Sequence, residues 1–179
     1  MYEIRWHGRG GQGSFTVARL LGMAASVFEG RYSLAFPSFG PERRGAPVLG
    51  FTRVSDEPIT DRSTVDECDY VVVLDETLIG PAVVSGIKEE GVLLVNTKDP
   101  SPYREMTDKK IVSFDATSLA IEVLGRPVTN TAMLGALVAE SGVVSLDAVK
   151  DAVMQGMKPS IAGKNCQVIE MAYKALKGE

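Results

Sequence analysis

Hydrophobic and polar positions alternate along the chain with two different periods, and together they predict an α/β fold. Short apolar or alternating runs are typical of strands, whereas apolar residues spaced three and four apart are typical of helices. The expected strands are residues 2–7, 31–36, 48–54, 70–74, 91–95 and 110–114. The expected helices are residues 14–29, 78–90, 117–124, 131–140, 145–157 and 164–176.

The order of these elements predicts a Rossmann-like open sheet, mostly parallel, with helices on both faces. The runs 70–74 and 91–95 are unbroken and apolar, as expected of strands that are covered on both faces. Residues 48–54 follow the preceding strand without a helix between them, which is consistent with an antiparallel strand in a mixed sheet. We find no linker or internal repeat, so we expect one domain over residues 1–179.

A glycine-rich turn joins the first strand to the first helix, and Ser14 is expected to cap that helix. The turn GRGGQG fits the pattern G-x-G-x-x-G, and its candidate binding residues are Gly8, Gly10, Gly11, Gln12 and Gly13. Glycines permit positive φ, and the amino end of the helix presents free N–H groups to an anion. The turn is therefore a candidate phosphate or carboxylate site. The alternative is that the glycines only permit a tight strand-to-helix connection.

A stiff loop, PSFGPERRGAP, occupies residues 37–47 and contains three prolines and two glycines. Such a loop loses little conformational freedom when it is ordered on a partner. We therefore expect it to contact a partner, with Ser38, Arg43 and Arg44 as the candidate residues. Guanidinium groups suit phosphate, so the two arginines could also meet a phosphate group. The alternative is a sheet-edge connection with exposed arginines.

Asn130 is the remaining candidate for ligand binding. It precedes an apolar helix, where it could simply act as the N-cap. Gly135 and the alanines around it favour close packing against another helix or the sheet.

His7 is the only histidine, and no nucleophile or carboxylate is placed beside it by the sequence, so we interpret it as structural. Asp75, Glu76 and Asp115 follow strands, where acids could bind a metal but commonly cap helices or face solvent. No established catalytic motif is present. We therefore assign no catalytic residue and no metal ligand.

Composition narrows the classes of function. The chain has 179 residues, a net charge of −4, and 45% hydrophobic and 23% charged residues. This balance disfavours disorder and general nucleic-acid binding. We find no membrane-spanning run and no signal peptide, so we expect a cytoplasmic location. Cys68, Cys166 and one histidine are too few for an ordinary iron–sulfur or zinc site, so any electron transfer must involve another chain or a bound cofactor.

Several segments together resemble the gamma subunit of pyruvate and related 2-oxoacid:ferredoxin oxidoreductases. The glycine turn and the Arg-containing loop, taken as a pair, are specific to this family. The residues of WHGRGGQG (6–13) and FPSFGPERRGAP (36–47) resemble the pyruvate and branched-chain members more closely than the 2-oxoglutarate members. The resemblance covers nearly the whole chain and rests on EIRWHGRGGQG (3–13), AFPSFGPERRGAP (35–47), DYVVVLDETLI (69–79), GVLLVNT (91–97) and NTAMLGAL (130–137).

The resemblance implies a role in a larger complex that converts a 2-oxoacid to acyl-coenzyme A and passes electrons to ferredoxin. It implies alpha, beta and ferredoxin-like delta subunits as partners, with thiamine diphosphate, Mg²⁺ and [4Fe–4S] clusters held by other chains. This chain would bind no cofactor firmly. Its turn at residues 8–13, its loop at 38–47 and Asn130 become candidates for contact with coenzyme A or another subunit.

Two alternatives remain at this point. One is a stand-alone dinucleotide-binding reductase that uses NADP, with Arg43 and Arg44 on the extra phosphate. Against this alternative, the sequence lacks the acidic residue that normally ends the second strand of an NAD site. The other is a purely structural subunit whose glycine turn binds nothing.

Overall fold

A computed structural model describes residues 1–38 and 44–178. Within them, six strands form one sheet in the order β2-β3-β1-β4-β5-β6. The strands are β1 (Tyr2–Arg9), β2 (Tyr32–Pro37), β3 (Pro47–Ser55), β4 (Cys68–Val73), β5 (Ile87–Asn96) and β6 (Lys110–Phe114). All six match strands expected from the sequence.

The sheet is mixed and mostly parallel. Strands β1, β4, β5 and β6 run parallel to one another, whereas β3 is antiparallel to both β1 and β2. The predicted antiparallel strand is thus confirmed. Because β2 and β3 are consecutive strands and antiparallel, the two pair as a hairpin on one side of β1.

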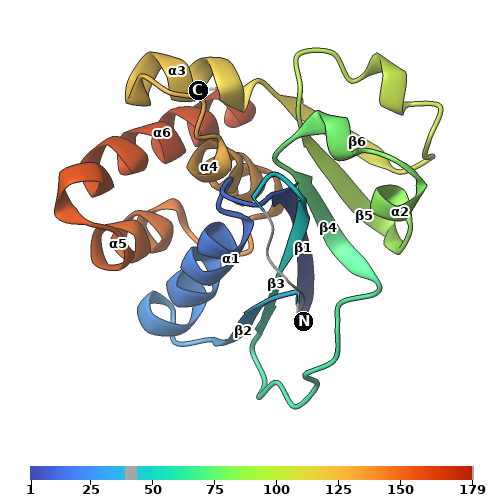
Figure 1. Ribbon diagram of the computed structural model, residues 1–179. Helices are drawn as coiled ribbons and strands as arrows, with labels where there is room; N and C mark the ends of the chain where they lie inside the picture. Colours follow the sequence, from blue (N-terminus) through green and yellow to red (C-terminus); the bar gives the residue numbers. More distant parts are fainter. Residues whose placement is uncertain (39–43, 179) are drawn as a thin grey trace.

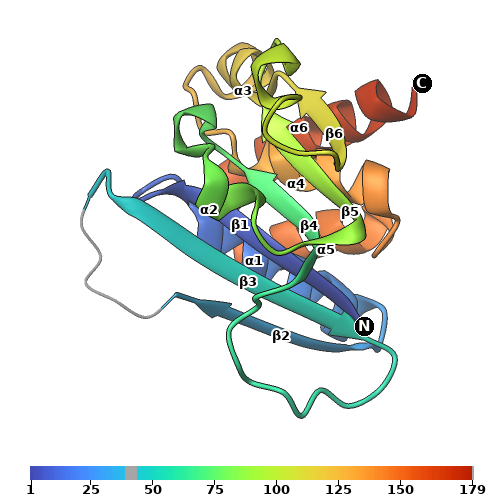
Figure 2. The same cartoon turned by 90° about the vertical axis from the view of Figure 1, so that its right-hand side faces the viewer.

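Most helices of the described residues lie on one face of the sheet, as Figures 1 and 2 show. They are α1 (Ser14–Met23), α3 (Ala116–Leu124), α4 (Asn130–Ser141), α5 (Leu146–Gly156) and α6 (Pro159–Lys177). On the opposite face lies the short helix α2 (Pro81–Val84), whose Val83 packs against residues of β4 and β5. Helices therefore occur on both faces, as predicted, but very unequally.

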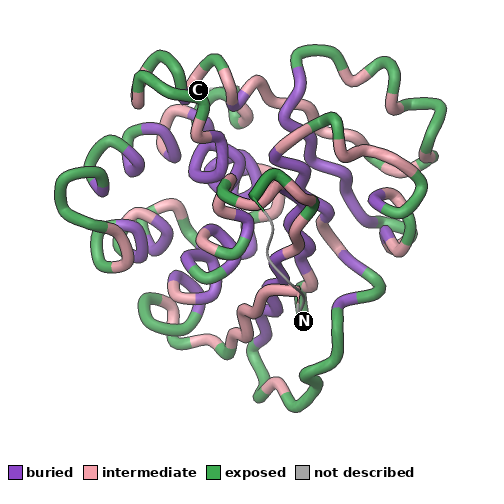
Figure 3. The backbone as a smooth tube through the Cα atoms, viewed as in Figure 1, coloured by how far each residue is buried: buried purple, intermediate pink, exposed green. Residues whose placement is uncertain are grey.

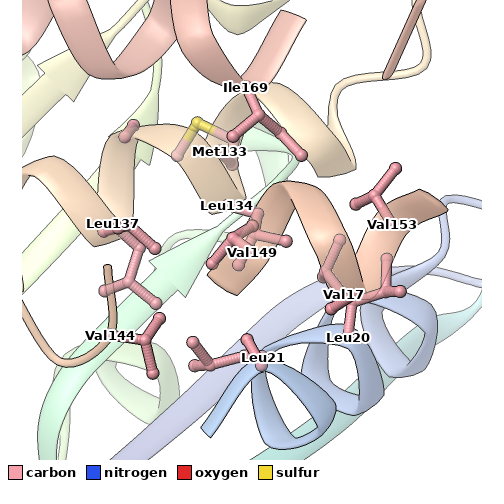
Figure 4. Packing of buried hydrophobic residues seen from close by; sticks show 14 of the residues in the cluster. Val17, Leu20, Leu21, Met133, Leu134, Leu137, Val144, Val149, Val153 and Ile169 are labelled. Carbon is pink, nitrogen blue, oxygen red and sulfur yellow. The ribbon is translucent and has the colours of Figure 1, made fainter. Parts of the chain in front are cut away.

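Helix α4 is the centre of the helical layer. All ten residues from Asn130 to Ala139 are buried, and Figure 3 shows this helix as a continuous buried element. Figure 4 shows Leu134 and Leu137 of α4 packed among side chains of α1, α5 and α6. Gly135 allows α4 and α6 to approach each other closely, because a Cβ there would lie 2.4 Å from the carbonyl oxygen of Ile169 in α6. The predicted packing role of Gly135 is confirmed.

The prediction of a helix over residues 78–90 is wrong. The structure has instead a 3₁₀ turn η2 (Glu76–Leu78), the four-residue α2, and then β5 from Ile87. Helix α2 ends at Val84, and the extended Ser85 follows it. Gly86 then has φ 75°, and a Cβ there would lie 2.0 Å from the carbonyl oxygen of Asp66. Its own carbonyl accepts from the amide of Cys68, so strand pairing with β4 overrides the helical spacing of this segment.

The first helix also differs in detail from the expectation. Ser14 is its first residue and not its cap, because Gly13 occupies the cap position with φ 81° and makes no side-chain cap bond. The helix continues as a π-helical turn, η1 (Ala24–Phe28), so that the helical segment nearly reaches the predicted end, where Gly30 has φ 67°. A second 3₁₀ turn, η3 (Ser101–Tyr103), precedes β6.

No helix in the described ranges 1–38 and 44–178 is both long and apolar enough to cross a membrane.

Candidate functional site

The glycine turn lies at the carboxyl edge of the parallel strands, where open α/β sheets bind their ligands. It connects β1 directly to α1, and Gly11 and Gly13 have φ values of 94° and 81°. Only glycine adopts this conformation without strain. The first amides of α1 have no partner within the helix, so they point a partial positive charge at the space beside the turn.

Gln12 braces the turn from within. Its backbone amide donates to the carbonyl of Arg9 at 2.9 Å, and its side-chain Oε1 accepts from the amide of Arg9 at 2.7 Å. The two bonds close the turn on itself and leave the Gln12 side-chain amide to donate elsewhere.

That amide reaches Asp75, which follows β4. Asp75 Oδ2 accepts from Gln12 Nε2 and from Arg9 Nε, both at 3.1 Å, and Asp75 Oδ1 accepts from the amide of Thr77 at 3.1 Å. Partial burial raises the pKa of Asp75, but the hydrogen bonds from Thr77 and Gln12 and the charge of Arg9 outweigh it, so this pKa lies below its ordinary value. The carboxylate therefore stays ionised and holds the turn against the β4–η2 connection.

The end of the stiff loop is joined to the same turn. The amide of Gly10 donates to the carbonyl of Ala46 at 2.8 Å, and the amide of Gly45 donates to the carbonyl of Gly10 at 3.2 Å. Arg9 Nη1 adds a bond to the carbonyl of Gly45 at 3.1 Å. The two segments that the sequence singled out are thus hydrogen-bonded neighbours.

The loop candidates lie in different places. Ser38 extends the β2–β3 hairpin, because its amide donates to the carbonyl of Leu49 and its hydroxyl accepts from the amide of Leu49. Arg44 is exposed next to the bonded segment, while Arg43 lies outside the described residues. Ser38 does not line the cavity beside the glycine turn.

A cavity of about 450 Å³ opens beside the turn, between the amino ends of α1, α4 and α6. Gly11, Gln12 and Gly13 form one wall, and Arg126 and Lys164 bring two cationic side chains to it. Three helix amino ends and two cations favour an anionic ligand. The other polar lining residues are Thr16, Asn130, Ser160 and Asn165.

Asn130 is brought to the turn from the first position of α4. A Cβ on Gly13 would lie 2.4 Å from Asn130 Nδ2, so the amide packs directly on the glycine backbone. The cap position belongs to Thr129, which makes no side-chain cap bond, and Asn130 Oδ1 accepts from the amide of Thr131 at 2.9 Å. Asn130 therefore contributes to helix capping and also lines the cavity.

Comparison with known proteins shows which family has this sequence and architecture. Residues 3–175 match the family described as pyruvate ferredoxin/flavodoxin oxidoreductase. The chain is 49% identical to pyruvate synthase subunit PorC of Methanothermobacter marburgensis, over 99% of this chain and 98% of that protein. It is 45% identical to the pyruvate/ketoisovalerate oxidoreductases common subunit gamma of Thermococcus kodakarensis, over 97% of this chain and 96% of that protein.

The chain belongs to the pyruvate ferredoxin/flavodoxin oxidoreductase family. A solved structure agrees with this assignment. The crystal structure of pyruvate oxidoreductase subunit PORC from Thermotoga maritima matches with a TM-score of 0.85 and 40% identity, covering 97% of this chain and 95% of that one. The resemblance inferred from the glycine turn and the Arg-containing loop is confirmed at the level of the family.

In this member of the family, the hydroxyl of Ser14 is an unsatisfied group at the turn. Ser14 Oγ is buried and has no hydrogen-bond partner in the described part of the chain. It lies over Gly8, where a Cβ would be 2.3 Å away from it. A buried hydroxyl without a partner destabilises the ligand-free protein, as is common at binding sites.

His7 has a structural environment, in line with the sequence interpretation. It is 7% exposed, and its Nε2 accepts from Arg5 Nε at 3.0 Å. Burial and the charge of Arg5 lower the pKa of His7 to about 3, so the imidazole is neutral near pH 7.

The strand-end acids bond within the chain. Asp115 caps α3 by accepting from the amide of Ser118 at 2.9 Å, and Glu76 accepts from the hydroxyl of Tyr103 at 2.9 Å. Among the described residues, no three His, Cys, Asp or Glu side chains are grouped to hold a metal ion.

Sequence reasoning missed Arg9, Arg126 and Lys164 at the site. Arg9 lies inside the glycine motif, and its long side chain gave no sign of its partners. Arg126 and Lys164 carried no motif at all, although Arg126 lies four residues before Asn130 and could have been considered with it.

Proposed function

We propose that this chain is the gamma subunit of a 2-oxoacid:ferredoxin oxidoreductase, with pyruvate as the favoured substrate. The complex decarboxylates the 2-oxoacid oxidatively, transfers the acyl group to coenzyme A and delivers electrons to ferredoxin. The chain contributes one gamma-type domain over residues 1–179. Support comes from relatives that are named as pyruvate synthase or common gamma subunits and that match over nearly their whole length.

The partners follow from the same proposal. Alpha and beta subunits would hold thiamine diphosphate and Mg²⁺, and a ferredoxin-like delta subunit would carry [4Fe–4S] clusters. The complex would work in the cytoplasm.

The cavity beside the glycine turn is the reason to propose that this chain binds coenzyme A. Coenzyme A ends in a nucleotide with several phosphate groups, and its thiol lies at the far end of a long flexible arm. Arg126 and Lys164 suit the phosphates, as do the amides at the start of α1. Gly11, Gln12, Gly13 and Asn130 line the cavity and would form the wall against which the nucleotide end packs. Gly8 and Gly10 would support this wall from within the turn, while Ser38, Arg43 and Arg44 would contact the ligand or a neighbouring subunit from the loop.

A subunit without redox centres can still control such a reaction. The acyl intermediate must be shielded from water and yet be reached by the thiol of coenzyme A. A domain that anchors the nucleotide end fixes where the thiol arm can reach, and this converts a loose encounter into an oriented one.

The dinucleotide alternative is less well supported. A carboxylate does follow β4, the parallel neighbour of β1, where a ribose-binding acid would be expected. However, both oxygens of this residue, Asp75, already accept hydrogen bonds from Arg9, Gln12 and Thr77. A ribose would have to displace them.

The test uses the complex purified from its native cell or reconstituted with its partner subunits. We expect the double variant Arg126→Ala/Lys164→Ala to raise the KM for coenzyme A at least tenfold, because two charged contacts are each worth about 1.5–3 kcal/mol. The reduction of clusters by the 2-oxoacid without coenzyme A should keep its rate.

Lys174→Ala is the matched control, since Lys174 lies on the same helix as Lys164 but pairs with Glu170 away from the cavity. Equal loss of both half-reactions in the double variant would argue for a purely structural subunit. Micromolar binding of a dinucleotide to the purified chain, measured by calorimetry, would favour the reductase instead.

A further inference from the structure

Asp75 joins the glycine turn to the η2 turn directly, and it reaches the loop end through Arg9. Its carboxylate accepts from Arg9 and Gln12 of the glycine turn and from Thr77 of the η2 turn. Arg9 in turn donates to the hydroxyl of Thr77 at 2.8 Å and to the carbonyl of Gly45 in the loop. Through one carboxylate, the turn, the loop end and the β4–η2 connection are linked.

Asp75 itself is outside the binding cavity. The residues that line the cavity include Gln12 but neither Asp75 nor Thr77. The Asp75 side chain is only 18% exposed and contacts the turn through Gln12, which does line the cavity. Any influence that it has on binding must therefore pass through Gln12 and the turn.

The chemistry of these contacts requires a carboxylate. Two oxygens receive donors from Arg9 Nε, Gln12 Nε2, the Thr77 amide and the Thr77 hydroxyl. An asparagine has the same shape but only one acceptor oxygen, so its NH₂ group would face at least one fixed donor in either orientation. The backbone of the turn depends on this support, because Gly11 and Gly13 have the flexibility to adopt many other conformations.

We propose that Asp75 is a positioning residue for the coenzyme A step, which acts by holding Gln12 and Arg9 so that the turn keeps its anion-binding shape. This inference rests on the proposed function of the cavity. Asp75 touches no reacting atom. It sets how well the preorganised amides of the turn match the ligand, and so it governs binding of coenzyme A and not the chemistry on the 2-oxoacid.

The experiment measures steady-state kinetics of the purified complex carrying Asp75→Asn. The expected result is a KM for coenzyme A raised about tenfold, from the loss of one charge-assisted contact, with an unchanged rate of cluster reduction by the 2-oxoacid alone. Asp115→Asn is the matched control, because Asp115 is also a strand-end carboxylate that caps a helix but has no contact with the turn. It should leave both rates unchanged.

A second variant guards against a folding defect. Thr77→Val keeps the shape of the side chain and removes the hydroxyl that joins Asp75 and Arg9, without touching the cavity. It should raise the KM for coenzyme A severalfold. In the purified full-length chain, the amides of Gly10 and Gly45 should exchange their hydrogens about tenfold faster in both variants, since these amides join the turn to the loop.

The outcomes separate the two proposals. An unchanged KM in Asp75→Asn, together with a raised KM in Arg126→Ala/Lys164→Ala, would overturn the role of Asp75 and leave the coenzyme A cavity in place. An unchanged KM in Asp75→Asn, Thr77→Val and Arg126→Ala/Lys164→Ala would overturn both the role of Asp75 and the coenzyme A cavity. The positioning role would also be overturned if Asp75→Asn slowed the coenzyme A-independent half-reaction as much as the coenzyme A-dependent turnover. Such a result would show a general structural effect.

Discussion

Asn130 and Gly13 are in direct contact, although 116 residues separate them in the chain: a Cβ on Gly13 would lie 2.4 Å from Asn130 Nδ2. The contact joins the amino end of α4 to the amino end of α1 at the wall of the cavity. Gly13 therefore meets two demands at once, a left-handed backbone and the absence of a side chain.

Gly13→Ala should lower the stability of the chain by about 1–3 kcal/mol, from backbone strain and the clash with Asn130. Gly11→Ala provides the comparison, because Gly11 also has positive φ but a Cβ there would meet nothing within 4 Å. Urea unfolding should show the smaller loss for Gly11→Ala. If adding Asn130→Ala to Gly13→Ala restores no stability, the steric part of this explanation is wrong.

The contact between α4 and α6 predicts a second difference between two glycines. Gly135→Ala should cost about 2–3 kcal/mol, because the new methyl group would meet backbone atoms of Ile169, which cannot move aside easily. Gly163→Ala, on an exposed face of α6 with nothing within 4 Å of its Cβ, should stabilise the chain by about 0.5–1 kcal/mol. Equal melting temperatures for the two variants would contradict the packing of these helices.

Acid should destabilise the chain through His7. Its pKa is lowered from 6.5 to about 3 in the folded protein, first by burial and then by the charge of Arg5. Between these two pH values the unfolded chain binds a proton that the folded chain excludes. Stability from this group is therefore complete above pH 6.5 and is lost as the pH falls toward 3, by up to about 1.4 kcal/mol per pH unit.

His7→Gln isolates this contribution, since Gln keeps an acceptor for Arg5 Nε but does not titrate. The difference in unfolding free energy between the original chain and this variant should vary with pH over that window and level off above it. A constant difference from pH 4 to 7 would show that His7 does not titrate in this way.

Two serines at helix starts should respond in opposite directions to alanine. Ser14→Ala removes a buried hydroxyl that has no partner in the described ranges, so the ligand-free chain should become more stable by up to about 1 kcal/mol. Ser145→Ala removes an N-cap whose hydroxyl accepts from the amide of Ala148 at 3.2 Å, and it should cost about 1 kcal/mol. Thermal unfolding of both variants decides the matter, and a loss with Ser14→Ala would mean that its hydroxyl is satisfied in solution.

Much of the fold was readable from local pattern. The buried run around Val72 and the alternation from Tyr2 to His7 identify strands because their side-chain period is local, and the same holds for the apolar stripe of α6. The segment from Leu78 to Glu90 was misread, because its helical spacing competed with pairing to β4, which no local pattern reveals. Five segments read together indicated the family, and the glycine turn and the loop at residues 37–47 were the most specific pair among them.

The sequence by itself determined the strand–turn–helix opening and the place of the glycine turn, since each depends on neighbours a few residues away. It was consistent with an antiparallel strand at residues 48–54, whereas the pairing of this strand with β1 and β2 is a tertiary property. Only the tertiary structure decided that Asp75 holds Gln12, that Asn130 packs on Gly13, and that Arg126 and Lys164 face one cavity. The physical reason is distance along the chain. A hydrogen bond or a steric contact depends on which groups the folded sheet brings within a few ångströms, and residue type and spacing carry no direct record of that proximity.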